Sequence, residues 1–409
     1  MKRVISIFAA VGLCLCLAIP AAATTPPLPK DAESANLKFN ADGKFKIIQV
    51  ADLQEAYTTS AITREFLLDV AEKERPDLFV LSGDNIASGP ANWGLQAISR
   101  FWVKRSIHSF MRVFDEIYEK YGIPVTMVFG NHDAEMKATS REQQFAIYST
   151  YKSFIGFKTD ADKGTKDEQG EHVGTHNLVI KNNAGTANAF NLWLFDSGAY
   201  DPRGGYGHVQ TPQLNWFTKT NDALGKLPSL AFQHIIVPEI YDVLTKTNEG
   251  AEDAIAQEFV NANGELFWQH FSKALPANAK GAVNEAPCPG RYNDGQYDLL
   301  KNAGNVMAIF SGHDHVNSFE VPGSVDLVNT ASVGFGSYGD AQIRGVRVIT
   351  LNESNLNDYG TELVLYKDFY PDTWLRRTRL SMYDKLHTFA VIFDFFSFRP
   401  MLWIAGLFD

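Results

Sequence analysis

The chain has 409 residues, of which 45% are apolar and 21% charged, and its formal net charge at pH 7 is −10. This length and composition are those of a globular protein that can bury a substantial core. The acidic charge argues against nucleic acid as the main partner, because an acidic surface repels backbone phosphates. An anionic substrate must therefore meet local positive charge, which a bound metal ion could supply.

The first 23 residues have the pattern of a cleavable signal peptide. Two positive charges precede an apolar stretch from Val4 to Ile19, and Pro20 and three alanines follow it. We therefore expect cleavage near Ala23 and a secreted or periplasmic protein. The alternative is a retained membrane anchor, but the apolar stretch is shorter than the roughly 20 residues that a span needs.

A linker is predicted at residues 24–37 and a folded domain at 38–370. After cleavage Cys288 is the only cysteine, so we expect no internal disulfide. At the start of the domain, two alternating apolar segments flank Asp42 and Gly43. They predict a β-hairpin whose second arm is a buried strand.

Short apolar runs recur along the domain, and most end in a polar or glycine-containing turn. Each predicts a buried strand, and the runs are PDLFVLSGDN, IPVTMVFGNHD, NLWLFDSGAY, SLAFQHII, NVMAIFSGHDH, VDLVNTASVGFG and GVRVITL. Apolar residues at spacings of three and four predict helices over TREFLLDVAEKE and ISRFWVKRSIHSFMRVFDEIYEKYG. This order of elements predicts a layered α/β domain rather than a helical bundle or an all-β barrel.

Two polar, glycine-containing stretches, residues 158–176 and 244–265, are predicted to be surface insertions. The first contains His172 and His176, which lie four residues apart. Gly174 between them weakens the case for a helical face that binds metal, so we do not include this pair in a metal site.

The chain ends in an apolar tail, predicted at residues 371–409. Its last 22 residues carry only Asp394, Arg399 and Asp409 as charged groups. Burying Asp394 and Arg399 in a bilayer costs about as much as the apolar residues gain, and Pro400 disfavours one continuous helix. We expect the tail to pack on the domain or to make peripheral contact with a membrane interface; a membrane span is the less favoured alternative.

Polar side chains follow the predicted strands, where open α/β sheets bind ligands. Mixed oxygen and imidazole ligands suit ions such as Mn, Fe and Zn, and there are more such ligands here than one ion needs. The sequence therefore predicts a site for two metal ions. The strand-end residues are Asp52 and Gln54, Asp84 and Asn85, Asn131, His132 and Asp133, His234, and His313 and His315.

Each of these signals also has a purely structural explanation. GD and GN are common turn pairs, and His234 in its apolar segment could be a buried core histidine. A metal site is favoured because all five segments end predicted strands. The glycines before Asp84, Asn131 and His313 would let the backbone turn tightly beneath the ligands.

The order of these motifs resembles that of the calcineurin-like metallophosphoesterases, over most of residues 45–350. The stretches FKIIQVADLQ, LSGDNI, FGNHDAE, LFDSG, GYGHVQTPQLNWF and FSGHDHVN are similar to the branch that holds purple acid phosphatase-like proteins. The resemblance implies a four-layer α-β-β-α sandwich and two ions bridged by Asp84. It further implies that one ion takes Asp52, Gln54 and His315, and the other takes Asn131, His234 and His313.

The chain departs from the family pattern at two positions. The family usually has His where Gln54 stands, and the purple enzymes have Tyr where this chain has Ala87. The missing tyrosine argues against the iron–phenolate chromophore. At position 54 an amide oxygen or a water would replace the imidazole, which predicts weaker binding of the first ion and a greater dependence on added metal.

The residues and the resemblance together predict a secreted phosphoesterase that uses two divalent or trivalent ions to activate a water against small-molecule or protein phosphate esters, with monoesters favoured. His132 is the candidate to stabilise the transition state or to protonate the leaving oxygen, with Asp133 fixing its orientation. Asn85 and His208 are candidate substrate-binding residues. The alternatives are a phosphodiesterase and a metal-binding protein that Gln54 has left weakly active or inactive.

Overall fold

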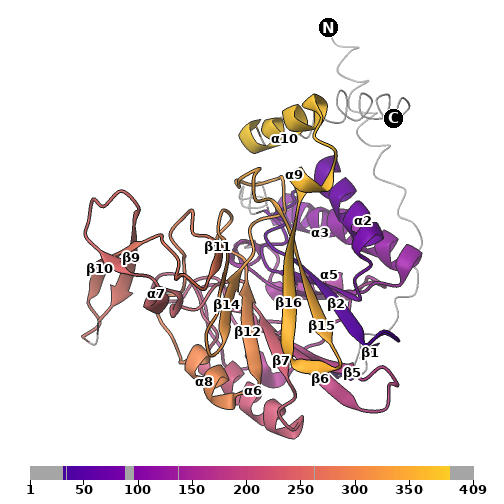
Figure 1. Cartoon of the computed structure of the whole chain (residues 1–409), viewed down its shortest axis with the longest axis horizontal. Coiled ribbons are helices and arrows are strands. Elements are labelled where there is room, and N and C mark those ends of the chain that lie inside the picture. Colours follow the sequence, from indigo (N-terminus) through magenta and orange to yellow (C-terminus); the bar gives the residue numbers. More distant parts are fainter. Residues whose placement is uncertain (1–30, 34, 88–95, 137, 262, 387–409) are drawn as a thin grey trace.

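The computed structural model contains two β-sheets that pack face to face, with helices on the outer side of each (Figure 1). One apolar core lies between the sheets, and a further core lies under the helices of each side. The predicted signal peptide and the last 22 residues of the tail lie outside the described residues. The structure describes residues 31–33, 35–87, 96–136, 138–261 and 263–386.

The smaller of the two sheets has five strands. Their order is β16 (Asn355–Leu365), β15 (Gly345–Asn352), β2 (Lys44–Val50), β3 (Leu78–Ser82) and β4 (Val125–Val128). Strands β2, β3 and β4 run parallel, and β15 and β16 are antiparallel additions at one side. β3 is buried along its whole length, which explains its mostly apolar sequence LFVLS.

The larger sheet has eight strands and contains the later predicted strands. Their order is β1 (Leu37–Lys38), β5 (His176–Lys181), β6 (Asn188–Leu194), β7 (Ser229–Phe232), β12 (Val306–Ser311), β14 (Asp326–Asn329), β13 (Ser318–Val321) and β11 (Lys280–Ala282). Strands β6, β7, β12 and β14 run parallel at its centre. Their carboxyl ends therefore point to one edge of the sheet.

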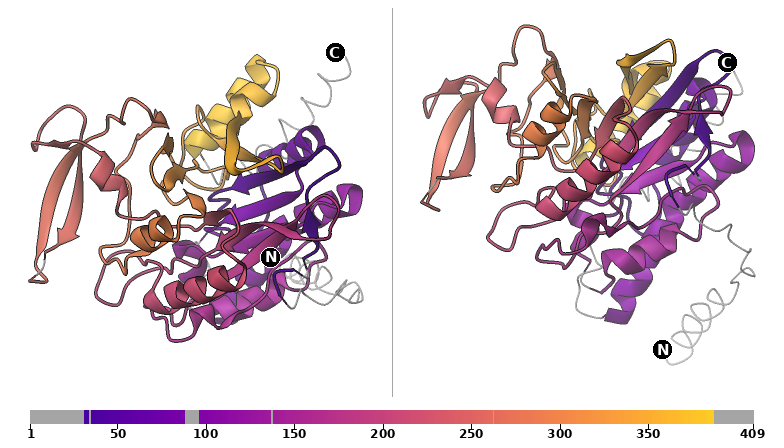
Figure 2. Two further views of the ribbon diagram at one scale, coloured as in Figure 1. Left: turned by 60° about the horizontal axis from the view of Figure 1, so that its bottom comes forward. Right: turned by 90° about the horizontal axis from the view of Figure 1, so that it is seen from below.

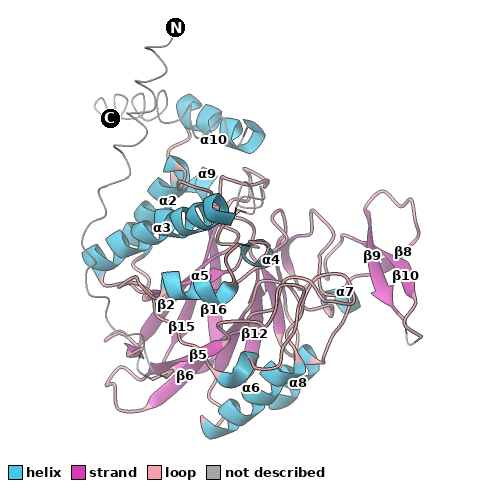
Figure 3. Cartoon of the chain, turned by 180° about the vertical axis from the view of Figure 1, so that it is seen from behind, coloured by secondary structure: helices cyan, strands magenta, loops and turns pink. Residues whose placement is uncertain are grey.

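The helices lie on the two outer sides of the strands (Figure 3). Those on the side of the smaller sheet are α2 (Ala61–Glu74), α3 (Gln96–Tyr121) and α5 (Arg141–Tyr148), and those on the side of the larger sheet are α6 (Thr211–Ala223) and α8 (Gln296–Ala303). The hydroxyl of Ser60 caps α2 by accepting from the backbone of Thr63, and α2 ends at Arg75 in the left-handed conformation. The described residues also form α10 (Trp374–Leu386), the short helices α4 (Asn131–Ala134), α7 (Ile240–Val243) and α9 (Tyr366–Phe369), and a 3-10 turn at Asp160–Asp162.

The buried side chains divide into the three cores that a four-layer arrangement requires. Ile47 and Val80 of the smaller sheet share the central core with Phe310 of the larger sheet. Phe79, on the opposite face of β3, packs edge-on against Phe114 of α3 at 5.4 Å between ring centroids. Full burial of each such side chain stabilises the fold by about 1.5–3 kcal/mol. The predicted α-β-β-α sandwich is confirmed.

The predicted hairpin around Asp42 and Gly43 is wrong. The chain does turn there, because Gly43 N donates to Asn40 O at 2.9 Å. β1, however, pairs in parallel with β5 of the larger sheet, while the second arm, β2, joins the smaller sheet as the buried strand expected. The two arms lie in different sheets and face each other across the core between them, to which the first contributes Leu37 and the second Phe45 and Ile47.

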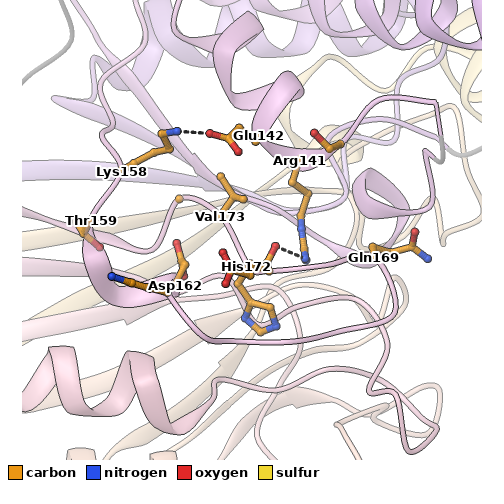
Figure 4. A pocket seen from close by; sticks show the side chains of 12 residues that line it. Arg141, Glu142, Lys158, Thr159, Asp162, Gln169, His172 and Val173 are labelled. Atoms are coloured by element: carbon orange, nitrogen blue, oxygen red, sulfur yellow. Dashed lines mark hydrogen bonds and ion pairs between the residues drawn. The ribbon is translucent and has the colours of Figure 1, made fainter.

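The prediction that residues 158–176 form a surface insertion is also wrong, because much of the segment is buried around Arg141 of α5. The Arg141 guanidinium donates to Asp167 Oδ2 at 2.6 Å and to Glu171 O at 2.6 Å. Figure 4 shows the pocket of about 350 Å³ that this segment lines, with Lys158 meeting Glu142 across it. None of the predicted metal ligands lines this pocket.

The histidines of this segment are buried but belong to no metal-ligand group among the described residues. His176 Nδ1 lies 2.6 Å from Gly174 O, and His172 Nδ1 lies 3.0 Å from Asp196 O. Burial lowers the pKa of His176 to about 4, so its imidazole is neutral at pH 7. Both side chains serve the packing of the segment.

The second stretch, residues 244–265, does form an addition to the domain. It contributes β8 (Lys246–Thr247) and β9 (Ala254–Val260), which with β10 (Leu266–Ser272) make a three-stranded antiparallel sheet. This sheet projects from the body of the molecule (Figures 1 and 2).

The part of the C-terminal tail that the structure describes packs on the domain through α10. Leu380 and Tyr383 join the core that contains α2, and Arg379 donates to Glu65 Oε2 at 2.6 Å. In the described ranges, no helix combines the length and the apolar character that a membrane span requires.

Replacing Arg141 by Met should lower the free energy of unfolding by about 3 kcal/mol, because Asp167 would then be buried without its charge partner. The Arg141 side chain is only 2% exposed, so solvent screens this pair little. Denaturant unfolding measures the effect. Lys158→Met is the matched control, since its pair with Glu142 is exposed and should contribute less than about 1 kcal/mol. Equal effects of the two substitutions would contradict the prediction.

Candidate metal centre

The predicted ligands converge because the parallel strands of both sheets end at a common edge. Asp52 and Asp84 follow β2 and β3 of the smaller sheet, and Asn131 follows β4. His234 and the pair His313 and His315 follow β7 and β12 of the larger sheet. Backbone hydrogen bonds join these segments. Two of them are Gln54 N to Asp84 O at 2.9 Å and Gly312 N to His234 O at 3.1 Å.

Asp84 lies at the centre of two groups of metal-ligating atoms. One group is Asp84, His234 and His313, and the other is Asp52, Asp84 and His315; within each group the ligand atoms lie within 4.8 Å of one another. All five side chains are buried. The two groups share one carboxylate, and the histidines fall into them in the division that the sequence resemblance implied.

The two amide residues lie beside these groups, one at each. Asn131 Oδ1 is 3.2 Å from His234 Nε2, so it can complete the first group. Gln54 Nε2 is 3.0 Å from Asp84 Oδ2 and 3.2 Å from His315 Nε2, so it lies at the second. The structure therefore brings together all seven residues predicted as ligands.

The backbone is strained at this site. Asp52, Gln54, Asp84 and His313 have φ angles of 50°, 40°, 49° and 74°, in the left-handed region that non-glycine residues rarely adopt. Such conformations cost free energy and cluster where function requires them. Four of the seven non-glycine residues with positive φ in the described chain lie here, so the strain is concentrated at the ligand loops.

Close packing explains two of the glycines that precede ligands. A Cβ added to Gly130 would lie 2.2 Å from Asp84 Oδ1, and one added to Gly312 would lie 2.6 Å from Asp52 Oδ2. No side chain larger than a hydrogen atom fits at either position without displacing a carboxylate. Glycine is thus required at both positions because the strand ends lie so close together.

The hydrogen bonds of two histidines determine which ring nitrogen faces the centre. His234 Nδ1 lies 3.0 Å from Ser82 O, and His315 Nδ1 lies 2.9 Å from Tyr338 O. A carbonyl oxygen can only accept, so Nδ1 carries the hydrogen in both rings and Nε2 is left to bind a cation.

The donor set fits a pair of cations. Among the described residues, His313 Nε2 is buried without a hydrogen-bond partner, which is unusual for a polar atom that has no further role. Burial holds the pKa of His313 well below its usual value and lowers that of His315 to about 4, so both imidazoles are neutral. The pKa of Asp52 is raised to about 7, first by burial and also by the nearby carboxylate of Asp84. The opposing charge of His234 lowers it, but by less than these two effects together raise it.

His132 lies at the open side of this centre. Its side chain is 34% exposed, and its Nε2 is 3.8 Å from Asp84 Oδ2. Its backbone N donates to Asp84 Oδ1 at 2.8 Å, which fixes the start of α4 against the bridging carboxylate.

The prediction that Asp133 orients His132 is wrong, because the Asp133 carboxylate has other partners. The Asp133 carboxylate is buried and accepts from the backbone of Gly130 at 2.9 Å and from those of Asn85 and Ile86 at 3.2 Å. It braces two ligand loops against each other. His132 Nδ1 instead meets Glu135 Oε2 at 2.8 Å. Glu135 lies three residues along the same helical turn, a spacing that places side chains on one face.

The two predicted substrate-binding residues lie in different surroundings. The Asn85 amide donates to Val128 O at 3.1 Å and to Asp133 Oδ2 at 3.3 Å, so it supports the loop beneath Asp84. His208 lies between two carboxylates, with Nε2 3.2 Å from Asp294 Oδ1 and Nδ1 3.5 Å from Asp201 Oδ2. Contact of either side chain with substrate remains a prediction.

Aromatic side chains that the sequence analysis did not single out cover the histidine ligands. The ring of Tyr206 packs edge-on against His313 with centroids 4.4 Å apart, and that of Tyr338 stacks on His315 at 4.1 Å. Tyr200 stacks on Tyr206 at 5.5 Å. Tyr200 follows the motif LFDSG and Tyr206 lies within GYGH, but nothing in those motifs indicates contact with histidines more than 100 residues away.

Comparison with known proteins agrees with this geometry. A family model described as calcineurin-like phosphoesterase matches residues 45–317. Two proteins of Arabidopsis thaliana are similar: probable inactive purple acid phosphatase 29 is 27% identical over 390 residues, 85% of each chain, and probable inactive purple acid phosphatase 14 is 28% identical over 352 residues, 76% of each chain. Among solved structures, a dimetal phosphatase from Danio rerio aligns with a TM-score of 0.43 at 12% identity, covering 79% of this chain and 99% of that one.

Proposed function

Because the chain belongs to the calcineurin-like phosphoesterase family, we propose that it is a metal-dependent hydrolase of phosphate monoesters. The observation that carries this proposal is the pair of three-residue groups that share Asp84. Two ions bound there would supply positive charge for the phosphate oxygens and lower the pKa of a water between them. Local charge of this kind allows an acidic protein to accept an anionic substrate.

The side chains of the centre would hold the two ions and orient the ester. Asp52 and Asp84 supply the negative charge, and His234, His313 and His315 supply imidazole nitrogens. His132, the partly exposed imidazole beside Asp84, would donate from Nε2 to the phosphoryl group or to the leaving oxygen. The preference for monoesters is supported by the printed names of the relatives, which contain the words purple acid phosphatase.

Hydrolysis assays test this function. Metal-free protein is supplied with Mn, Fe, Zn or Mg and given 4-nitrophenyl phosphate or its diester, bis(4-nitrophenyl) phosphate. We expect turnover of both, with a higher kcat/KM for the monoester. Absence of turnover with every metal, together with only one bound ion per chain, would refute the proposal.

The second candidate is a protein that binds metal without catalysis. It is favoured by Gln54 in place of an imidazole and by the printed names of the two plant relatives, both called probable inactive. Bound metal without hydrolysis of either ester would select it.

Replacing Gln54 by His should tighten binding of the weaker ion by at least about tenfold and increase turnover at low metal concentration. Both neighbours of the Gln54 amide accept hydrogen bonds, so the amide must turn its oxygen inward before it can bind a cation. An imidazole presents a nitrogen lone pair directly, and His tolerates the φ of 40° at this position better than most residues. Calorimetric titration of the metal-free protein measures the affinity.

Gln54→Leu is the control for this substitution, because it roughly keeps the volume and removes the amide oxygen, the one atom of this side chain that can bind a cation. It should weaken the same ion relative to the unsubstituted protein. If the His and Leu variants bind metal equally, position 54 does not contribute a ligand.

We further propose that the protein is exported and that its apolar tail contacts a membrane interface. The support is the charged and apolar pattern of residues 1–23 and the composition of residues 388–409. Sequencing the N-terminus of the mature protein tests export: a start near Thr24 is expected, and an intact Met1 would contradict it.

A further inference from the structure

Glu135 links His132 to a tyrosine at the rim of the centre. One oxygen, Oε2, lies 2.8 Å from His132 Nδ1, and the other, Oε1, accepts from the Tyr200 hydroxyl at 2.7 Å. The carboxylate therefore bridges an imidazole and a phenol. Neither Glu135 nor Tyr200 belongs to the metal-ligand groups.

The chemistry of the three groups fixes the direction of both hydrogen bonds. An ionised carboxylate can only accept, so the Tyr200 hydroxyl donates and the hydrogen of His132 lies on Nδ1. The other nitrogen, Nε2, is left facing Asp84 at 3.8 Å. A histidine held in this way presents Nε2 to whatever binds at the shared carboxylate.

Tyr200 also connects the hydrogen-bonded residues His132 and Glu135 to the rest of the site. The Asn131 amide donates to the Tyr200 hydroxyl at 3.5 Å, and the Tyr200 ring stacks on Tyr206, whose ring contacts His313. The phenol is therefore held from two sides. His132 is thereby anchored through Glu135 and Tyr200 to the first ligand group, which contains His313.

We propose that Glu135 and Tyr200 are positioning residues that fix the tautomer and the orientation of His132, so that Nε2 donates to the leaving oxygen; this inference rests on the proposed hydrolase function. As water forms a bond to phosphorus, the bond from phosphorus to the leaving oxygen breaks and its electron pair stays on that oxygen. The proton on Nε2 of the His132 imidazolium moves to the leaving oxygen. The hydrogen on Nδ1 stays there and remains hydrogen-bonded to Glu135. The attacking water loses one proton to solvent, and solvent returns one to Nε2.

A double-mutant cycle tests the proposal through kcat with two esters. An alkyl phosphate needs protonation of its leaving oxygen, whereas 4-nitrophenyl phosphate has a good leaving group and needs little. We expect His132→Ala and Glu135→Gln to lower kcat for the alkyl ester at least about a hundredfold, and for the nitrophenyl ester by much less. Glu135→Gln should have no further effect once His132 is Ala, because it acts through that imidazole.

Tyr200→Phe should cause a smaller loss than Glu135→Gln with the same leaving-group dependence, and metal content should stay at the wild-type value in all these variants. Additive effects in the double variant, or equal losses with both esters, would overturn the proposal.

A measurement without turnover separates failure of this inference from failure of the proposed function. The nitrogen chemical shifts of histidines labelled with ¹⁵N report which ring nitrogen of His132 carries the hydrogen, with and without Zn²⁺. At a pH at which the His132 imidazole is neutral, we expect hydrogen at Nδ1 in the wild type and a mixture of tautomers in Glu135→Gln. If the tautomer is unchanged by the substitution, the positioning role is refuted whether or not the protein hydrolyses esters.

Discussion

Replacing Asp84 by Asn should reduce turnover by about a thousandfold and lower the metal content to one ion per chain or fewer. Asp84 is the one residue common to both ligand groups, so its loss removes a charged ligand from each. Asn is the conservative choice because it tolerates the φ of 49° at this position and can still accept the hydrogen bond from His132 N through its amide oxygen. Elemental analysis and an ester hydrolysis assay measure the two effects.

Asp314→Asn is the matched control for this substitution. Asp314 lies between His313 and His315 in the sequence, but its carboxylate accepts from Cys288 N at 3.1 Å and belongs to neither ligand group. Burial raises the pKa of Asp314 well above its usual range, so an amide closely replaces the protonated acid. Metal content and turnover should both stay near the wild-type values. A full wild-type rate in the Asp84 variant would refute the assignment of the site.

Replacing His132 by Ala should lower turnover of an alkyl phosphate by about a hundredfold to a thousandfold and leave the metal content unchanged. The imidazole lies beside the shared carboxylate of Asp84 and is 34% exposed, but it is part of neither ligand group. Loss of activity at constant metal content would identify a residue that acts on the ester. Loss of metal as well would instead show that His132 is needed to build the centre.

His270→Ala provides the control, because His270 lies on β10 in the projecting three-stranded sheet. It should retain full turnover and full metal content. If His132→Ala is as active as this control, His132 has no part in the reaction.

The positions of the ligands could be predicted from sequence because parallel strands end at one edge. Once β3, β4, β7 and β12 are recognised as buried strands, the polar residues that follow them must meet. The order of the motifs then indicates which side chains share an ion. The four layers follow from the same alternation of strands and helices.

Other features depend on contacts that local patterns do not encode. The alternation near Asp42 predicts a strand on each side of the turn, but it cannot show that the two strands belong to different sheets. Polar residues in 158–176 predict a surface segment, yet Arg141 and its carboxylate partners satisfy one another in the interior. β16, with the sequence NLNDYGTELVL, was not predicted because this edge strand is largely exposed and carries many polar side chains.

Local sequence patterns also fail to indicate the neighbours of His132. GNHD indicates Asp133 as its neighbour, whereas the helical turn of α4 brings Glu135 to the imidazole. The tyrosines that cover the histidines come from loops whose sequences have no metal-binding pattern. Residues that act through other residues are therefore harder to find from sequence than the ligands themselves.

The most direct test of a two-ion hydrolase is a titration of the metal-free protein with Mn²⁺ during hydrolysis of 4-nitrophenyl phosphate. We expect two ions to bind per chain, the second more weakly because of Gln54, and turnover to rise with occupancy of the second site. Full turnover at one ion per chain, or two bound ions without hydrolysis of the monoester or the diester, would contradict this function.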